Sequence, residues 1–350
     1  MAYTGTAYGD ISPRTAAKVV TGLLERSEPL LMIEKFGKTK ELPRNETQSM
    51  KFRRYFLVHS EMGSDYEAGT YFGSSKFDPT SFVLSEGVTP AATKLDSEDI
   101  TIALTQYGNR IELSDWIYDT HEDPILQESM DIISEQAAVI LEKVRYNKLV
   151  AGTNVQRGAS TGTARDDVDQ FLTLNLQRKA TRQLKRNLGK PITRVLKSGP
   201  EYANYSVAPA YIALCHTDLE PTIRGLAGFV PTEEYGKMDI YPGEIGKVEN
   251  VRYIASTVFE AFEDAGDLVG QFSSTPISTT GTNADVYPII VLAQNGFAVT
   301  PLKGRSSIHP IVVNPKPSDS DPMAQRGHVA WKAWHGLGIL NEMWVTRIEV

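Results

Sequence analysis

The stretch that decides the fold is DPILQESMDIISEQAAVILEKVRYNKLVAG, residues 123–152. Asp123 and Pro124 are typical of a helix start, and Gly152 is typical of a helix end. Between them, apolar residues recur at alternating spacings of four and three, which predicts one buried helix face: Leu126, Met130, Ile133, Ala137, Ile140 and Val144. At a rise of about 1.5 Å per residue, the helix would be roughly 40 Å long. The pattern therefore predicts a scaffold helix that spans a domain and carries no chemistry.

The charges of this stretch follow the helix dipole. Acidic side chains lie toward its N-terminus and basic side chains toward its C-terminus, the latter being Lys143, Arg145 and Lys148. This distribution stabilises a helix, because the dipole is positive at the N-terminus and negative at the C-terminus.

The composition is that of an ordinary soluble globular protein. Hydrophobic residues make up 41% and charged residues 23% of the 350 residues, a length that favours two lobes over one core. The first residues lack a basic, apolar leader, and no apolar run reaches the roughly 18 residues of a membrane span. We therefore expect a protein of the cytoplasm with no membrane partner. The formal net charge of −7 argues against nucleic-acid binding as its main task.

The first third of the chain has few signs of a compact core. Residues 1–50 are expected to form an arm, with one short helix followed by irregular sequence. Residues 51–113 are expected to form a long two-stranded excursion with a polar tip, too thin for a core of its own. Apolar residues change phase near Gly108 and Asn109, which predicts a β-bulge there.

The rest of the chain mixes one more helix with short strands. Asp166 or Asp167 is expected to open a helix that ends at Gly189 and has a basic second half. After Pro209 a mixed lobe begins, in which YIALC is a buried-strand candidate and Cys215 a buried residue. Residues 286–302 are expected to form two strands bent at Asn295–Gly296. The last 24 residues are expected to form a long strand with one irregularity near Leu340–Asn341.

Known catalytic motifs are incomplete in this sequence. The GxSxG pattern around Ser160 follows a helix in a polar connector, which is the wrong context for a nucleophile. His121–Glu122 lacks the second histidine of a zinc motif, and Gly37-Lys38-Thr39 lacks the leading glycine of a phosphate loop. His216 and Asp218 are expected to form a structural hydrogen bond. We therefore predict no catalytic residue, no cofactor and no metal site.

Two alternative functions start from particular residues. A nucleic-acid-binding module would use the basic and aromatic stretch 51–56 together with the basic residues of 178–190. The other alternative, a serine hydrolase, would use Ser160.

Several stretches together resemble a known family. They are KFRRYFLV (51–58), LSEGVTP (84–90), ITIALTQYGNRIELSDW (100–116), the long helix, PAYIALCHTDLEPTIRGL (209–226), PTEEYG (231–236), PGEIGKVENVRYIAST (242–257) and the final DPMAQRGHVAWKAWHGLGILNEMWVTRIEV (321–350). In their order, they resemble tailed-phage major capsid proteins of the HK97-type fold, and locally those of N4-like phages.

The resemblance implies an α+β fold in which each region has a role. Residues 1–50 would be the N-terminal arm, 51–113 the extended loop, and 114–204 a peripheral domain with a spine helix at 124–151. An axial domain would occupy 205–305, and residues 306–350 would return to the peripheral domain. A candidate assembly interface follows on the extended loop: Phe52, Arg53, Arg54, Tyr55, Glu86, Tyr107 and Arg110.

The function implied is that of a major capsid protein. It would assemble with itself into hexamers and pentamers of an icosahedral shell around double-stranded DNA, with weak nonspecific contact to that DNA. Scaffolding, portal and decoration proteins would be further partners. The protein would be assembled in the host cytoplasm and would reside in the virion.

Overall fold

The structure is a computed structural model. It describes residues 31–56, 78–89, 92, 95–120, 125–196, 204–235, 240–241, 243–272, 275–303, 309–317 and 321–350. Most of the predicted arm, the middle of the predicted excursion and the predicted helix cap at Asp123–Pro124 lie outside the described residues.

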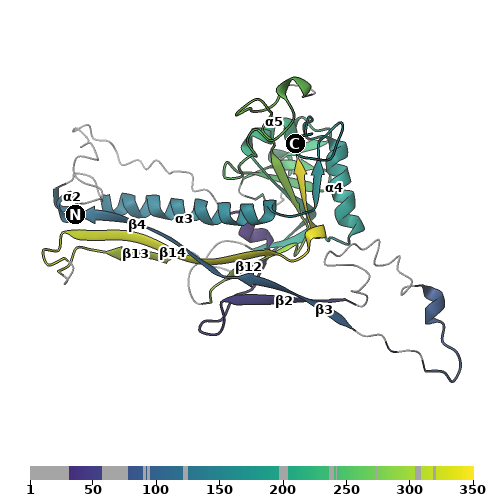
Figure 1. Ribbon diagram of the computed structural model, residues 1–350, viewed down its shortest axis with the longest axis horizontal. Coiled ribbons are helices and arrows are strands. Elements are labelled where there is room, and N and C mark those ends of the chain that lie inside the picture. Colours follow the sequence, from purple (N-terminus) through teal and green to yellow (C-terminus); the bar gives the residue numbers. More distant parts are fainter. Residues whose placement is uncertain are drawn as a thin grey trace.

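A five-stranded sheet and one long helix form the extended part of the molecule (Figure 1). The sheet is built around β14 (Arg326–Ile339). β4 (Thr105–Ser114) lies along one edge of β14, while β13 (His309–Val313) and β12 (Phe297–Pro301) follow each other along the other edge. β1 (Lys38–Thr39) pairs in parallel with β12.

The long helix α3 spans Ile125–Val150 and packs on this sheet. Ile133, Ala137 and Leu141 of α3 are buried against Val329 and Trp331 of β14. The preceding short helix is α2 (Asp115–Thr120). The long helix that the periodicity predicts is therefore present, although its buried stripe shifts along its length.

A compact lobe contains an eight-stranded sheet (Figure 1). In spatial order its strands are β5 (Val155–Arg157), β15 (Val345–Glu349), β11 (Pro288–Leu292), β7 (Asn204–Cys215), β10 (Val251–Ala255), β9 (Glu244–Val248) and β8 (Phe229–Pro231), with β6 (Ile192–Leu196) pairing to β7. Alternate residues of β7 enter different cores: Ile212 and Leu214 face one, and Tyr211 and Ala213 face the other. Because both faces are covered, the strand is apolar throughout, as predicted for YIALC.

Two helices cover one face of this lobe. They are α4 (Leu174–Arg186) and α5 (Glu220–Arg224). α4 begins at Thr173, whose hydroxyl accepts a hydrogen bond from the backbone N–H of Leu176. The predicted start at Asp166 or Asp167 is therefore wrong by about two turns. The short 3-10 helices are η1 (Ile33–Phe36), η4 (Pro79–Phe82), η5 (Thr217–Leu219), η6 (Thr232–Tyr235), η7 (Val269–Gln271) and η8 (Glu342–Trp344).

A two-stranded ribbon leaves the five-stranded sheet and points away from both lobe and helix (Figure 1). It consists of β2 (Ser49–Phe56) and β3 (Asp96–Ala103), which pair antiparallel without a register shift. The bulge predicted at Gly108–Asn109 is wrong, because β4 pairs with β14 in continuous register through both residues. The phase changes instead at Leu104, where the chain passes from the ribbon into the sheet.

The two sheets are joined where the chain crosses between them twice. β11 leads into β12 through Ala293–Gly296, and β14 leads into β15 through Leu340–Trp344. These links hydrogen-bond to each other, since Ala293 donates to the carbonyl of Trp344 at 3.0 Å and Leu340 donates to that of Gly296 at 2.8 Å. The predicted bend at Asn295–Gly296 is confirmed. The predicted single C-terminal strand is instead two strands in two sheets.

The described part of the arm also packs within its own chain. Ile33 and Phe36 lie in the core between α3 and the lobe, and Leu42 is buried. Residues 31–42 of the predicted arm therefore pack within their own subunit. Residues 1–30 lie outside the described part.

Candidate assembly surfaces

Charged cross-strand pairs fix the register of the ribbon. Arg53 faces Asp99, with Nε 2.7 Å from Oδ1, and Arg54 faces Glu98 at 3.1 Å. The hydrogen bond from Arg53 lowers the pKa of Asp99. Arg54 also donates to the carbonyl oxygen of Leu340 at 3.1 Å, which ties the ribbon to the crossing between the sheets. Two predicted interface residues, Arg53 and Arg54, therefore hold the ribbon within its own subunit.

Phe52 is buried within its own chain, where it packs with Ile102 of β3 and Ala298 of β12. It lies on the ribbon face that meets the sheet, which explains this burial, and its role in an assembly interface remains a prediction. Tyr55, three residues further along β2, is 60% exposed.

The other predicted interface residues have mixed environments. Glu86 is exposed in the segment before the ribbon returns. Tyr107 is half-buried and packs beneath α3. The exposed side chain of Arg110 pairs with Glu112 at 2.8 Å. No described contact brings these seven residues into one cluster, and their assembly role remains a prediction.

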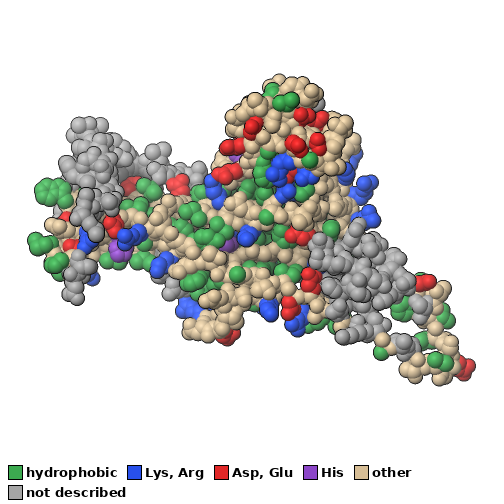
Figure 2. Space-filling view, in the orientation of Figure 1, with side chains coloured by type: hydrophobic (Ala, Val, Ile, Leu, Met, Phe, Trp, Pro, Cys, Tyr) green, Lys and Arg blue, Asp and Glu red, His purple; other side chains and the backbone are tan. Residues whose placement is uncertain are grey.

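Two groups of exposed apolar side chains lie far from the packed cores. The loop patch is 60–75% exposed and consists of Phe82, Val83, Leu84, Val88 and Leu95. The end patch lies at the end of the five-stranded sheet away from the lobe and consists of Trp116, Ile132, Val312, Val313 and Met323. Figure 2 shows apolar side chains gathered at both extremities. Because contiguous exposed apolar surface is typical of contact sites, these two groups are candidate contacts with a partner.

A buried charge cluster connects the arm, α3 and β14. It contains four side chains: Glu34, Glu142, Arg145 and His335. Arg145 is 1% exposed and donates to Glu34 at 2.6 Å, to Glu142 at 3.3 Å and to Nε2 of His335 at 3.2 Å. Oε1 of Glu142 accepts the backbone N–H groups of Met32 at 3.0 Å and Ile33 at 2.9 Å. The cluster therefore holds η1 against the helix.

The protonation states in this cluster follow from its burial. Desolvation first, and then the charge of Arg145, lower the pKa of His335 to about 3. The imidazole is neutral, and its Nε2 accepts the hydrogen bond from Arg145. Burial raises the pKa of Glu142, while Arg145 and the two backbone N–H groups favour its ionised form. The cluster thus places one guanidinium beside a buried carboxylate and a neutral imidazole.

A second buried carboxylate lies at the end of β15. Glu349 is fully buried and accepts hydrogen bonds from Arg157 at 2.8 Å and Arg165 at 2.7 Å, with Arg347 2.9 Å away. Burial raises the pKa of Glu349, but the surrounding guanidinium groups outweigh it and the net shift is downward. The guanidinium of Arg165 also stacks over Phe262 at 3.6 Å. The cluster fixes the connector 155–170 to the lobe.

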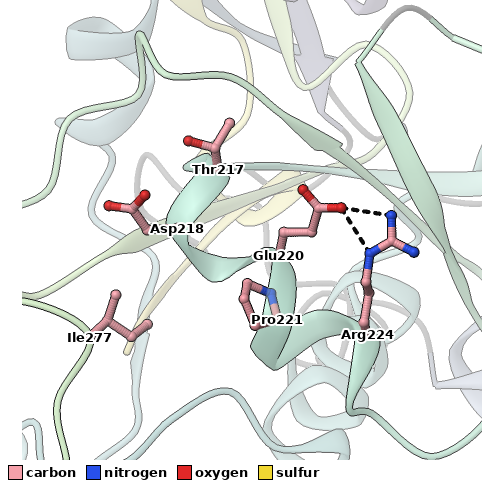
Figure 3. A pocket seen from close by; sticks show the side chains of 6 residues that line it. All are labelled: Thr217, Asp218, Glu220, Pro221, Arg224 and Ile277. Carbon is pink, nitrogen blue, oxygen red and sulfur yellow. Dashed lines mark hydrogen bonds and ion pairs between the residues drawn. The ribbon is translucent and has the colours of Figure 1, made fainter.

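One hollow lies beside α5 on the lobe (Figure 3). Its lining consists of Thr217, Asp218, Glu220, Pro221, Arg224 and Ile277. Arg224 donates to Glu220 at 2.8 Å, and Asp218 accepts from Tyr287 at 3.1 Å. The charged groups of this lining are thus paired in structural contacts, and we assign the hollow no ligand.

The structure shows the surroundings of the residues that belong to the incomplete catalytic motifs. Ser160 is exposed; its hydroxyl accepts a hydrogen bond from the side chain of Gln170 at 2.8 Å, and its backbone N–H donates to Oδ1 of Asp169 at 2.8 Å, so both groups of Ser160 make structural contacts. It follows the short strand β5 rather than a helix, which the sequence analysis did not anticipate. His216 accepts the backbone N–H of Asp218 at 3.1 Å, which confirms the predicted structural hydrogen bond. Cys215 is buried as predicted, and burial raises its pKa.

The remaining motifs also have structural places. Lys38 and Thr39 of the phosphate-loop-like motif form β1. His121–Glu122 lies outside the described residues. Within the described residues, no group of three His, Cys, Asp or Glu side chains is arranged to hold a metal ion. Among the described helices, none combines the length and the hydropathy that crossing a bilayer requires.

The six residues of the predicted buried helix face differ in their burial. Ile133 and Ala137 are buried, whereas Ile140 and Val144 are half-buried at its margin. The side chains of Leu126 and Met130 lie outside the described residues. Leu141 and Leu149 are also buried although the predicted face omits them, and the burial of Arg145 was not predicted.

A long helix on a sheet, a compact lobe, a projecting ribbon and uncovered apolar ends define the class of shell-forming proteins. The family model described as phage capsid protein matches residues 97–348. The chain belongs to the phage capsid protein family. No curated protein matches it.

Solved structures with the same fold come from phage heads. The head structure of Helicobacter pylori bacteriophage KHP40 is 12% identical, covers 90% of this chain and 87% of its own, and has a TM-score of 0.57. The capsid of Ralstonia phage GP4 is 10% identical, with coverage of 97% and 98% and a TM-score of 0.57. The capsid of Cyanophage P-SCSP1u is 12% identical, with coverage of 99% and 94% and a TM-score of 0.54.

These comparisons confirm the α+β, HK97-type capsid fold and the structural role of a capsid protein. Neither a nucleic-acid-binding module nor a serine hydrolase receives support as the main function. The narrower resemblance to N4-like phages stays a prediction.

Proposed function

We propose that copies of this chain associate into hexamers and pentamers that close into an icosahedral shell around double-stranded DNA. The observation that carries this proposal is the exposure of the loop patch and the end patch at separate extremities of one subunit. A contact between two different surfaces of identical subunits generates a ring when the rotation closes. Further contacts between rings then extend the assembly into a shell.

Each part of the fold receives a role in this assembly. The extended loop comprises the ribbon and the segment between its strands, residues 49–103, because β4 is already a strand of the five-stranded sheet. That sheet and α3 form the peripheral domain. The eight-stranded sheet forms the axial domain, and β5, β6 and α4 are included with it because they pack on it. The arm, predicted as residues 1–50, then ends before β2 begins at Ser49.

The shell has a structural role without catalysis. Its subunits are made in the host cytoplasm and end in the virion, with scaffolding, portal and decoration proteins as further partners. The paired charges of the hollow and the structural hydrogen bonds of Ser160 with Gln170 and Asp169 support this assignment.

A shortened ribbon tests the proposed assembly. Phe56 and Asp96 face each other across the ribbon, so an Asn-Gly turn in place of residues 57–95 closes it without changing β2 or β3. We expect soluble, folded subunits that form no shells in electron microscopy, whereas the full chain forms them. The circular dichroism spectrum checks the fold. Normal shells from the shortened chain would contradict the role of the extended loop.

A further inference from the structure

One face of α4 consists of basic side chains. With about 3.6 residues per turn, the five basic residues of the helix fall within an arc of roughly 120° around its axis. They are Arg178, Lys179, Arg182, Lys185 and Arg186, and all are exposed. Lys190 is exposed just beyond the helix end. The basic face is defined as Lys179, Arg182, Lys185, Arg186 and Lys190.

The opposite face of α4 fixes its orientation. Ala180 and Leu184 are fully buried against the lobe. Gln177 donates to the backbone carbonyl of Val248 at 3.0 Å and accepts from the hydroxyl of Tyr253 at 2.8 Å. The helix cannot rotate without breaking these contacts, so the basic face stays exposed in the folded subunit.

The segment that carries this face has charges of one sign. Residues 174–190 contain six of the 36 Lys and Arg residues of the chain and no Asp or Glu, although the whole chain carries a net charge of −7. Arg178 is engaged by Glu249, with Nε 2.9 Å from the carboxylate, and Lys185 lies near enough to lower the pKa of Glu249 as well. Figure 2 shows basic side chains gathered at the edge of the lobe where Figure 1 places α4.

The chemistry of this face fits phosphate better than a protein surface. The exposed positions of α4 include no apolar or aromatic side chain, and Leu188, which is 47% exposed, lies just past the helix end. Protein interfaces have apolar centres and are depleted in lysine, whereas nonspecific DNA contact needs only mobile cationic side chains. The loop patch and the end patch already offer a neighbouring subunit apolar surface elsewhere.

We propose that the basic face of α4 is the surface through which each subunit contacts the phosphates of the packaged DNA. This inference rests on the proposed shell and adds an orientation to it, since α4 then faces the shell interior. The contact is independent of base sequence. From Lys179 to Arg186 the helix rises about 10 Å, a length over which one DNA strand presents about three phosphates.

Salt dependence provides the first test. Binding of the unassembled full-length chain to a 20-base-pair duplex is measured by fluorescence anisotropy at several salt concentrations. The variant K179Q/R182Q/K185Q keeps good helix formers and removes three charges. It should bind the duplex at least about tenfold more weakly at 50 mM salt. The slope of the logarithm of the association constant against the logarithm of the salt concentration should become less negative by about 2.7.

A matched control separates this face from net charge. K148Q/K303Q/K316Q removes the same three charges from exposed positions away from α4. The control should bind within about twofold of the unmodified chain if its lysines make no phosphate contact. Equal losses in the two variants, or no DNA binding by the unmodified chain, would overturn the proposal.

Labelling of intact particles tests the orientation. A lysine reagent that does not enter filled particles should leave Lys179, Lys185 and Lys190 unmodified, and formaldehyde should crosslink this segment to DNA. Labelling from outside would overturn the proposal, as would zero-length crosslinks from these lysines to acidic residues of a second copy. If no shells form at all, the proposed function fails, while the anisotropy measurement still decides the DNA contact.

Discussion

At the scale of single residues, Arg145 is the side chain on which the described arm, α3 and β14 depend together. It is 1% exposed and is the cation of the buried cluster that includes Glu142. Removing one partner of a buried pair leaves the other charge without compensation, which costs about 3–5 kcal/mol. Arg145→Met should therefore lower the free energy of unfolding of the subunit by that amount, as measured by urea denaturation.

Lys148 provides the control for this substitution. It lies on the same helix one turn away but is exposed. Lys148→Met should change the free energy of unfolding by less than about 0.5 kcal/mol. An Arg145→Met subunit as stable as the Lys148→Met subunit would show that Glu142 finds another partner or stays neutral.

His335 makes the stability of the subunit depend on pH. Its folded pKa of about 3 lies below the value of 6.5 expected in the unfolded chain. The unfolded chain therefore binds a proton first as the pH falls, so the stability present above pH 6.5 is lost between 6.5 and about 3. At pH 5, protonation of His335 in the unfolded chain would lower the free energy of unfolding by about 2 kcal/mol.

A substitution isolates this contribution from those of the carboxylates. His335→Gln keeps an acceptor for Arg145 but does not titrate. Between pH 7.5 and pH 5, the variant should lose about 2 kcal/mol less of its free energy of unfolding than the unmodified chain. Glu142 and Glu349 titrate in both proteins, so their contributions cancel in the comparison. Identical pH profiles would contradict a buried neutral imidazole.

At the scale of elements, the ribbon crosses the five-stranded sheet where β14 carries two glycines. A Cβ atom on Gly336 would lie 2.8 Å from the carbonyl oxygen of Ala103, and one on Gly338 would lie 2.7 Å from Cγ1 of Ile102. Such close approach of β3 to β14 requires residues without side chains at both positions. The crossing sets the direction in which the ribbon leaves the subunit.

Gly336→Ala tests this crossing. The new methyl group meets a backbone atom that cannot rotate away, so the ribbon must shift, at a cost of about 1–3 kcal/mol in unfolding free energy. We expect lower stability in urea denaturation and malformed or absent shells in electron microscopy. Gly270→Ala is the control, because a Cβ there meets nothing within 4 Å. Normal shells and stability from Gly336→Ala would mean that the close approach is not required.

Sequence periodicity predicted the presence of the helices and strands well, but it did not predict which sheet each strand joins. The sequence shows a change in the phase of the apolar residues near Gly108–Asn109 and another near Leu340–Asn341. A bulge within one strand and a move of the chain to another sheet produce the same change of phase. β3 and β4 separate at Leu104, and β14 and β15 separate at Leu340–Trp344. The difference lies in the hydrogen-bond partners, which come from distant parts of the chain.

The long helix shows a second limit of periodicity. Its buried stripe passes from Ile133 and Leu141, under β14, to Leu149 in the core beside the lobe, because α3 meets two different partners along its length. A single face calculated from spacing missed that drift. Arg145 was predicted only as a charge that the helix dipole favours, since nothing local indicates that Glu34 and His335 lie beside it. The spacing of Glu142 and Arg145 by three residues was the available signal.

At the scale of the whole molecule, the described parts of the subunit are held together by specific polar contacts, whereas two apolar patches are exposed. The two sheets are joined by adjacent hydrogen-bonded crossings, and buried charge clusters hold η1 and the connector 155–170 in place. The loop patch and the end patch, in contrast, have no cover among the described residues. In the proposed shell, substitutions in these two patches should therefore affect assembly without affecting folding.

Val83→Asp/Leu84→Asp should separate assembly from folding. Both side chains are more than 70% exposed in the subunit, so charging them should change the free energy of unfolding by less than about 0.5 kcal/mol. In a contact with a neighbour, the same charges would be buried without partners, and we expect no shells by electron microscopy or sedimentation. Ser85→Asp/Thr89→Asp adds two charges to the same exposed segment without removing apolar surface, and it should reduce assembly less. If both double variants assemble equally well, the loop patch is not covered in the shell; if both fail equally, charge in this segment, rather than the loss of apolar contact, prevents assembly.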